Sequence, residues 1–282
     1  MTRPGPVVVV GRGRMGSLLA QAWKSAGVRV DLVAGRSAGQ GEAPAGLATE
    51  GPTLWVLAVR DGALEATAEA LRPWVSPDAV AVHLAGIRGP EALLPLRGHV
   101  QALASAHPLV AVSSPQPGRS LRGSAVLCEG DPAALVRCEA AFGALGVSVW
   151  TAPSVDRATY HGGAALVATG AVALAQGASD AFRAALGGAG SEPMVRAAVA
   201  SLLRSVADNV LADGADGALA SPLLRNDTRA VAAHLAALGA VDPRAAGLYR
   251  AALRRVLKTL RARGDVTTET LDAAEVLASE GA

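Results

Sequence analysis

The feature that most constrains the fold is the stretch from Val7 to Gly16, where four consecutive valines are followed by a G-x-G-x-x-G pattern. Four β-branched residues in a row predict a strand that is buried on both faces, as in a parallel sheet. In such a pattern the first glycine allows a tight turn, the second admits a pyrophosphate, and the third lets a helix pack closely. The helix expected over 14–26 would direct its free N–H groups at that phosphate. An ordinary glycine-rich turn is the alternative. The predicted cofactor contacts here are Gly11, Arg12, Gly13, Arg14, Met15 and Gly16.

The second expected strand, over 28–34, indicates which dinucleotide is bound. An NAD enzyme usually has an acidic residue at the end of this strand, which binds the ribose 2′-hydroxyl. Here the chain continues with Arg36 and Ser37 instead. A guanidinium and a hydroxyl suit a phosphate monoester, so we expect NADP rather than NAD. The alternative is that Arg36 is an exposed loop arginine.

Composition limits the possible partners and the compartment. The 282 residues are 51% hydrophobic and 18% charged, which is enough apolar material for two modest domains. The formal charge is +2, and no basic run predicts binding to nucleic acid. Cys128 and Cys138 lie in different expected elements, and their spacing suggests neither zinc nor redox chemistry. We therefore expect no metal site, and two reduced thiols in a cytoplasmic protein.

The stretch from Gly162 to Ala178 is the longest weakly polar segment. It consists mostly of alanine and glycine, and it falls short of the roughly 20 strongly apolar residues that a membrane span needs. The N-terminus lacks the pattern of a signal peptide, because the valines continue directly into glycines. We therefore expect a buried helix over 162–178 and no membrane contact. A helix that is apolar almost all round needs covering on several sides, which predicts a homodimer through this region.

The predicted secondary structure changes near Pro153. Before it, strands are expected over 7–10, 28–34, 54–59, 79–83, 100–105, 124–128 and 147–150. Two helices are also expected there: Asp61 is the predicted N-cap of a helix that reaches residue 71, and Asp131 is the predicted N-cap of a helix after 132. After it, helices are expected over 155–186, 192–212, 228–238, 243–263 and 268–279. The prediction is an α/β Rossmann domain with a doubly wound, mostly parallel sheet over 1–152, followed by an all-α domain over 153–282.

Ligands of open α/β sheets bind beyond the carboxyl ends of the strands. That rule places Arg60, Asp61, His83 and His107 near a bound nicotinamide. Val59 and Arg60 are further predicted cofactor contacts. Pro108 keeps His107 in an extended conformation. We expect His83 to be a structural histidine. For His107 a structural and a functional role remain equally open.

Two later segments carry further candidates. Tyr160 and His161 lie early on the first long helix, where a second domain would close over the cofactor, unless they form a solvated polar pair. Arg225 offers a bidentate contact to a substrate carboxylate. Asp227 either takes part in the site or only caps the next helix. We expect His107, His161 and Asp227 to converge at a cleft between the two domains.

Together these residues resemble a known group, the Rossmann-like NADP-oxidoreductase-like proteins with a helical C-terminal domain of unknown function. The group is related to pyrroline-5-carboxylate reductase and to the 6-phosphogluconate and 3-hydroxyacid dehydrogenases. The resemblance implies the fold and the cofactor, and less firmly the reaction. The matching points are Gly11 to Gly16, Val59-Arg60-Asp61, His83 to Gly86, Leu93 to Leu96, Ala106 to Leu109, Tyr160-His161, and Ser221 to Asp227 with His234.

The chain also departs from the family pattern. Arg60 replaces proline, Ala85 serine, Ser221 and Asn226 glycine, and Thr169 asparagine, while Ala165 stands where the 3-hydroxyacid dehydrogenases have lysine. Lysine-based alcohol oxidation is therefore not expected. The leading hypothesis is an NADP-dependent oxidoreductase acting on a small C=O or C=N substrate that bears a carboxylate. His107 or His161 would be the acid, Arg225 the substrate anchor and Asp227 its orienting carboxylate, and Tyr160 is a further catalytic candidate. The alternative is an NADP-binding sensor or scaffold without turnover.

Overall fold

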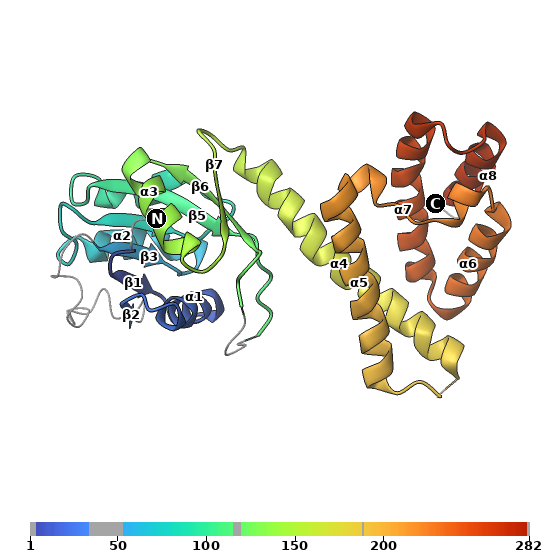
Figure 1. The fold of residues 1–282 in the computed structure, drawn as a ribbon, viewed down its shortest axis with the longest axis horizontal. Helices are drawn as coiled ribbons and strands as arrows, with labels where there is room; N and C mark the ends of the chain where they lie inside the picture. The colour runs from blue at the N-terminus through green and yellow to red at the C-terminus, as the bar shows by residue number, and fades with distance from the viewer. Residues whose placement is uncertain (1–3, 34–52, 115–119, 188, 281–282) are drawn as a thin grey trace. The chain divides into compact units, whose positions relative to one another are not determined.

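The structure is a computed structural model that describes residues 4–33, 53–114, 120–187 and 189–280. The chain forms two compact units, residues 1–165 and residues 166–282, and each is described by itself. The ribbon is shown in Figure 1. The predicted cofactor contacts Arg36 and Ser37 lie outside the described residues.

Within the described residues, the first unit has one seven-stranded sheet in the order β2-β1-β3-β4-β5-β6-β7. Strands β1 to β5 are parallel, β6 is antiparallel to β5, and β7 is parallel to β6. The chain order reverses between β1 and β3, which is the place where such sheets bind ligands. The predicted α/β class is confirmed. The strands are β1 Val7–Val10, β2 Val30–Val33, β3 Leu54–Leu57, β4 Val80–His83, β5 Ala102–Pro108, β6 Ala125–Gly130 and β7 Ser148–Thr151.

Helices cover both faces of this sheet (Figure 1). Because side chains alternate along a strand, Val7 and Val9 enter the core formed with α1 and α3, while Val8 and Val10 enter the core formed with α2 and η4. On the first face, the Trp23 indole N–H donates to the carbonyl of Ala141 at 2.7 Å. The helices are α1 Arg14–Ser25, α2 Leu64–Leu71 and α3 Pro132–Gly143, with 3-10 segments η3 Asp61–Ala63 and η4 Pro90–Leu96.

Three local predictions need correction. Strand β5 continues through His107 and Pro108, because β6 pairs with it as far as Pro108, so His107 lies inside the strand. Asp61 opens the 3-10 turn η3, and Ala63 occupies the N-cap position of α2. Asp131 is the N-cap residue of α3 as expected, but its carboxylate accepts from the Leu103 N–H at 2.9 Å and not from an N–H of the helix.

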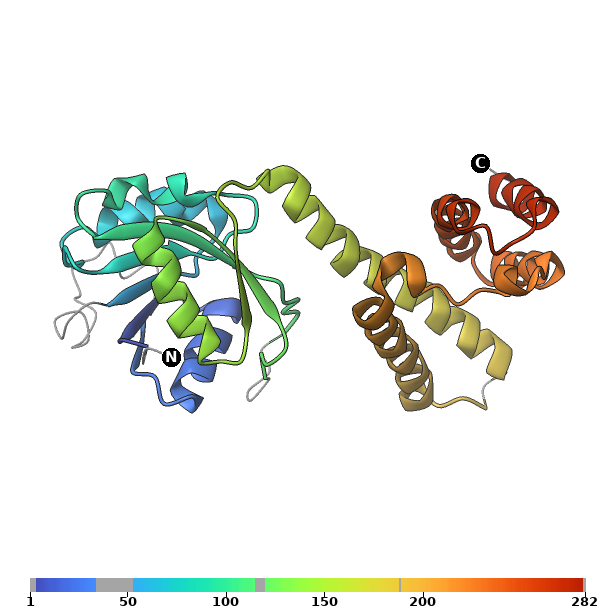
Figure 2. The same cartoon turned by 45° about the horizontal axis from the view of Figure 1, so that its top comes forward.

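The remaining helices include one that starts in the first unit. Helix α4 spans Arg157–Leu186 and is followed by α5 Glu192–Gly217, η5 Pro222–Arg225, α6 Thr228–Val241, α7 Pro243–Arg263 and α8 Thr268–Ser279. Asp242 and Thr267 cap α7 and α8 by accepting from backbone N–H groups. Helices α6, α7 and α8 lie side by side (Figure 2) and share an apolar core that contains Val231, Leu253 and Leu271.

Helix α4 was expected to be buried, and the single chain does not bury it. None of its described residues is buried, since α6 to α8 pack among themselves. Leu166 and Val167 on α4 are 76% and 73% exposed, and Leu211 on α5 is 88% exposed. In length and hydropathy α4 satisfies the criteria for a membrane span, although much of its sequence is alanine and glycine. Exposed apolar surface of this kind is typical of an interaction surface.

Candidate functional site

The glycine turn is built so that two of its glycines are sterically required. Gly11 has φ +123°, and a Cβ there would lie 2.3 Å from the carbonyl oxygen of Ala58. A Cβ on Gly16 would lie 2.0 Å from the carbonyl oxygen of Gly11, so α1 packs directly on the turn. Gly13 differs, because nothing lies within 4 Å of the position its Cβ would take. The turn therefore has one open side, at the N-terminus of α1, where a dinucleotide phosphate fits.

The other predicted cofactor contacts vary in their surroundings. Arg12 and Arg14 are exposed, and they donate to the carbonyls of Leu32 at 3.3 Å and Ser113 at 2.7 Å. Met15 packs against the core of the first unit. Val59 is half-buried after β3, and Arg60 is the exposed residue that precedes η3.

His83, at the end of β4, is a structural histidine as expected. Its side chain is fully buried, its Nε2 lies 2.8 Å from the carbonyl of Gly89, and its Nδ1 accepts from the Ala85 N–H at 3.2 Å. These two bonds fix a neutral ring with the proton on Nε2. Burial lowers the pKa of His83, which agrees with that assignment.

His107, Tyr160 and His161 meet in the first unit, although the last two lie far from His107 in the sequence. The hydroxyl of Tyr160 lies 3.0 Å from Nδ1 of His107. The His107 ring meets the rings of Tyr160 and His161 edge-on, at centroid distances of 5.6 and 5.5 Å. Strand β5 supplies His107, and the first turn of α4 supplies the other two. Three of the five residues predicted for catalysis are thus neighbours.

Gly86 makes this convergence possible. A Cβ at this position would lie 2.3 Å from Nδ1 of His161 and 2.9 Å from Nε2 of His107. The missing side chain therefore admits both imidazoles just beyond the end of β4. Nδ1 of His161 is buried and has no hydrogen-bond partner among the described residues.

A buried ion pair below these rings was not predicted from the sequence. Nε of Arg157 donates to Glu129 Oε2 at 2.9 Å, and its Nη2 contacts both Glu129 and the hydroxyl of Ser105. The two side chains are only 9% and 15% exposed. Glu129 also accepts from the N–H of Val155 at 3.3 Å. The available signal was a carboxylate in an apolar strand and an arginine one helical turn before His161.

Burial sets the protonation state of the pair formed by His107 and Tyr160. Burial is the main cause that lowers the pKa of His107 to about 4, with His161 and Arg157 adding to it. Burial also raises the pKa of Tyr160. Both groups are therefore neutral at pH 7. A neutral imidazole whose Nδ1 is bonded to a phenol has its Nε2 left to exchange a proton with a ligand.

Arg225 and Asp227 belong to the second unit, and their convergence with His107 and His161 remains a prediction. Asp227 caps α6 by accepting from the Ala230 N–H at 3.0 Å, so the capping role is confirmed. Asn226 adopts the left-handed conformation, with φ 54°, and its side-chain oxygen accepts from the Thr267 N–H at 3.1 Å. Arg225 is exposed and bonds to none of the described residues.

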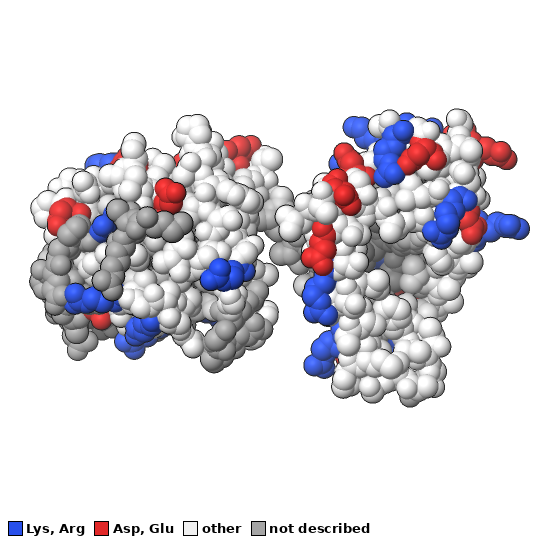
Figure 3. All heavy atoms as spheres, in the orientation of Figure 1, with Lys and Arg blue, Asp and Glu red and all other residues white. Residues whose placement is uncertain are grey.

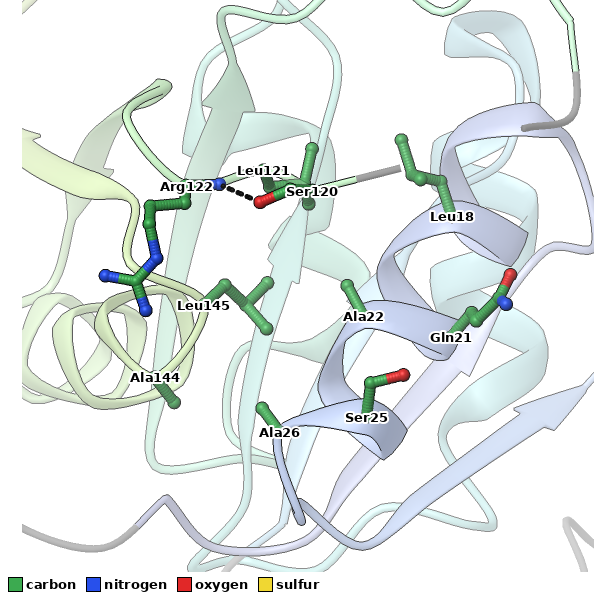
Figure 4. Close-up of a pocket in the computed structure, with 10 residues that line it drawn as sticks. All are labelled: Leu18, Gln21, Ala22, Ser25, Ala26, Ser120, Leu121, Arg122, Ala144 and Leu145. Atoms are coloured by element: carbon green, nitrogen blue, oxygen red, sulfur yellow. Dashed lines mark hydrogen bonds between the residues drawn. The ribbon is translucent and has the colours of Figure 1, made fainter. Parts of the chain in front are cut away.

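A separate pocket of about 320 Å³ lies in the first unit, as Figure 4 shows. The second half of α1, the turn at Ser120 to Arg122 and the end of α3 line it. None of the described residues predicted for the site lines this pocket.

The glycine turn yields a testable contrast between two substitutions. We expect Gly16→Ala to lower the free energy of unfolding by about 1–3 kcal/mol, because its methyl group would collide with backbone. Gly13→Ala should change stability by less than about 1 kcal/mol and weaken NADPH binding, because its methyl group would occupy the open side. Urea unfolding without ligand and NADPH titration measure the two effects. Equal stability losses, or unchanged NADPH affinity in Gly13→Ala, would contradict the assignment.

The lowered pKa of His107 predicts a pH dependence of stability. The unfolded chain protonates this ring near its ordinary pKa of 6.5, and the folded chain does so near 4. Between these values the unfolded state binds more protons, so the free energy of unfolding falls as the pH falls through that window. His107→Gln removes this dependence. The stability difference between variant and wild type should be constant above pH 6.5 and shift in favour of the variant below it. A difference that does not change from pH 7 to 4 would refute the prediction.

The comparisons with known proteins cover parts of both units. Residues 124–256 match the model of a domain of unknown function, DUF2520. No curated protein sequence matches the chain. A protein from Thermotoga maritima has the same fold at 18% identity and a TM-score of 0.62, over 92% of this chain and 99% of that one.

Two further solved structures share the fold. A proposed NADP oxidoreductase from Bacteroides fragilis is 20% identical, with a TM-score of 0.64 over 90% of this chain and 98% of its own. Pyrroline carboxylate reductase from Plasmodium falciparum, solved with NADP bound, is 12% identical, with a TM-score of 0.55 over 97% of this chain and 99% of its own. The predicted resemblance is therefore confirmed: the chain has the fold of these two proteins, and its residues 124–256 match the domain of unknown function DUF2520.

Proposed function

We propose that the chain is an NADP-dependent oxidoreductase that transfers hydride to or from a small C=O or C=N compound bearing a carboxylate. The observation that carries this proposal is the pairing of His107 with Tyr160 on the same sheet whose first turn is open at Gly13. Parallel strands present their carboxyl ends at one edge, so the turn and the pair belong to the ligand-binding edge. The names of two proteins of the same fold, an NADP oxidoreductase and pyrroline carboxylate reductase, support it.

Residues of the first unit have separate roles in the proposed reaction. When bound, NADP exchanges hydride with the substrate carbon. In the reducing direction, Nε2–H of His107 gives its proton to the substrate oxygen or nitrogen, while the Tyr160 hydroxyl gives its proton to Nδ1. Nδ1 then returns this proton to Tyr160 while Nε2 takes a proton from solvent, which restores the starting state, and the oxidising direction runs in reverse. His161 packs on the edge of His107 and restricts its ring.

The substrate carboxylate is assigned to the second unit. Arg225 is exposed, with no bond to a described residue, so its planar donors remain free for a bidentate contact. Asp227, two residues later, uses Oδ1 for its cap and keeps Oδ2 to orient that guanidinium. We place the protein in the cytoplasm, since Cys128 and Cys138 are both buried free thiols.

The cofactor and the reaction are tested separately. Dissociation constants for NADPH and NADH, measured at one salt concentration for wild type and Arg36→Ala, should show tighter NADPH binding and its selective loss. NADPH oxidation is then followed with imines, 2-oxo acids and aldehydes. His107→Gln should lower kcat by about 10²–10⁴-fold and leave the NADPH affinity unchanged. NADPH binding with no turnover in the whole panel would instead indicate a sensor or scaffold, which the loss of polar residues at Ala85 and Thr169 would explain.

We also propose that a second copy of the chain covers α4 and α5. Figure 3 shows a broad surface of the second unit without charged side chains. The exposed apolar residues of the two helices are Leu166, Val167, Val172, Leu174, Leu186, Met194, Leu202, Leu203, Val206, Val210 and Leu211. So large an apolar surface exceeds what a monomer usually presents to water. A symmetric pair of such faces would cover itself.

Light scattering at micromolar concentration should therefore give the mass of a dimer. Val167→Asp combined with Leu202→Asp should shift the mass to that of a monomer, because each carboxylate would be buried in the interface. Val276→Asp, on an exposed apolar position of α8, is the matched control and should leave the dimer intact. A monomeric wild type, or a control that dissociates equally, would rule out this arrangement.

A further inference from the structure

Arg157 and Tyr160 occupy neighbouring positions of the first turn of α4. Residues three apart lie on one face of a helix, so the guanidinium and the phenol leave the helix on the same side. Arg157 is tied to two strands at once, through Glu129 on β6 and Ser105 on β5. The hydroxyl of Tyr160 has one hydrogen-bond partner among the described residues, which is His107 on β5.

The register of the sheet explains why one arginine reaches both strands. Ser105 and Glu129 stand directly opposite each other in the β5–β6 pair. His107 lies two residues after Ser105, and therefore on the same face of β5. Ser105, which contacts Arg157, and His107, which pairs with Tyr160, are thus neighbours on one face of β5. Fixing Arg157 on Ser105 and Glu129 fixes the first turn of α4, and with it the distance between Tyr160 and His107.

We propose that Arg157 is a positioning residue of the His107–Tyr160 pair: held by Glu129 and Ser105, it sets the first turn of α4 on the sheet and keeps a positive charge beside the phenol. This inference rests on the proposed function for its catalytic meaning, but its structural content stands without it. The positive charge of Arg157 would stabilise the phenolate that forms when Tyr160 passes its proton to Nδ1 of His107.

The charged and titratable groups around the pair support this assignment. They are Arg157 and His161 on α4, His83 on β4, Asp61 on η3, and Cys128 and Glu129 on β6. Burial raises the pKa of Tyr160, and of these groups it is the positive charge of Arg157 that opposes this rise. Nη1 of Arg157 is buried and unpartnered among the described residues, so Glu129 and Ser105 leave that nitrogen free.

The test uses the fact that the chain contains two tyrosines, Tyr160 and Tyr249. Arg157→Met is combined with Glu129→Gln, since removing one partner alone would leave an uncompensated buried charge. With tyrosine labelled at the ring carbon that bears oxygen, alkaline titration by NMR follows both phenols in the full-length protein. We expect the pKa of Tyr160 to rise by about one unit in the double variant. Tyr249, in the second unit beside His234, serves as the internal control.

Two further variants separate positioning from general loss of structure. Arg97→Gln removes an arginine from the ion pair with Asp131 elsewhere in the first unit, and it should leave the Tyr160 titration unchanged. Arg157→Lys keeps the charge but lacks the planar fork, and it should give an intermediate shift. A folded double variant in which Tyr160 titrates as in wild type would overturn the proposal. So would an equal shift in Arg97→Gln.

Turnover distinguishes this proposal from the proposed function. With an active substrate, the double variant should lower kcat by about tenfold, the equivalent of one pKa unit, with little change in KM or NADPH affinity. An unchanged kcat would overturn the role of Arg157 in catalysis. If wild type oxidises NADPH with no compound of the panel, the proposed function fails, and the titration of Tyr160 still decides whether Arg157 controls that phenol.

Discussion

The arrangement of the candidate site depends on the buried ion pair between Arg157 and Glu129. Removing two charges from water costs several kcal/mol for each ion, and only good geometry with additional hydrogen bonds offsets that cost. Here Ser105 and the N–H of Val155 supply those bonds. The pair joins the start of α4 to two strands, so the first turn of this helix, with Tyr160, stays with the sheet.

Much of the fold could be predicted because the signals were local. The valine run fixed β1 at Val7–Val10, and Asp242 followed by a proline fixed the start of α7, which has the bounds expected for it. The misses required contacts between distant residues. Strand β5 is longer than predicted because β6 returns antiparallel along it, and α4 is exposed because α6 to α8 find their apolar partners among themselves.

The same contrast between local signals and distant contacts applies to the candidate site. Strand-end position and the following proline were enough to select His107, and helix position was enough to select Tyr160 and His161. Arg157 and Glu129 were missed, since β7 separates them in the sequence and no local pattern links a carboxylate on a strand to an arginine that follows much later in the chain. At Asp227 the capping role, one of the two roles that the sequence predicted, is confirmed by the hydrogen bond from the Ala230 N–H, and the role in the site stays a prediction.

Gly86 has a consequence for how sequences of this type can vary. This glycine is required by what lies opposite it, two imidazoles within 3 Å of the place its Cβ would take, and not by a left-handed backbone. Any larger residue there must displace His107 or His161. Among relatives with this architecture, position 86 should therefore covary with the two histidine positions, so that alanine or serine appears together with replacement of one ring. A position usually dismissed as a loop glycine would then report whether the paired imidazoles are retained in a given lineage.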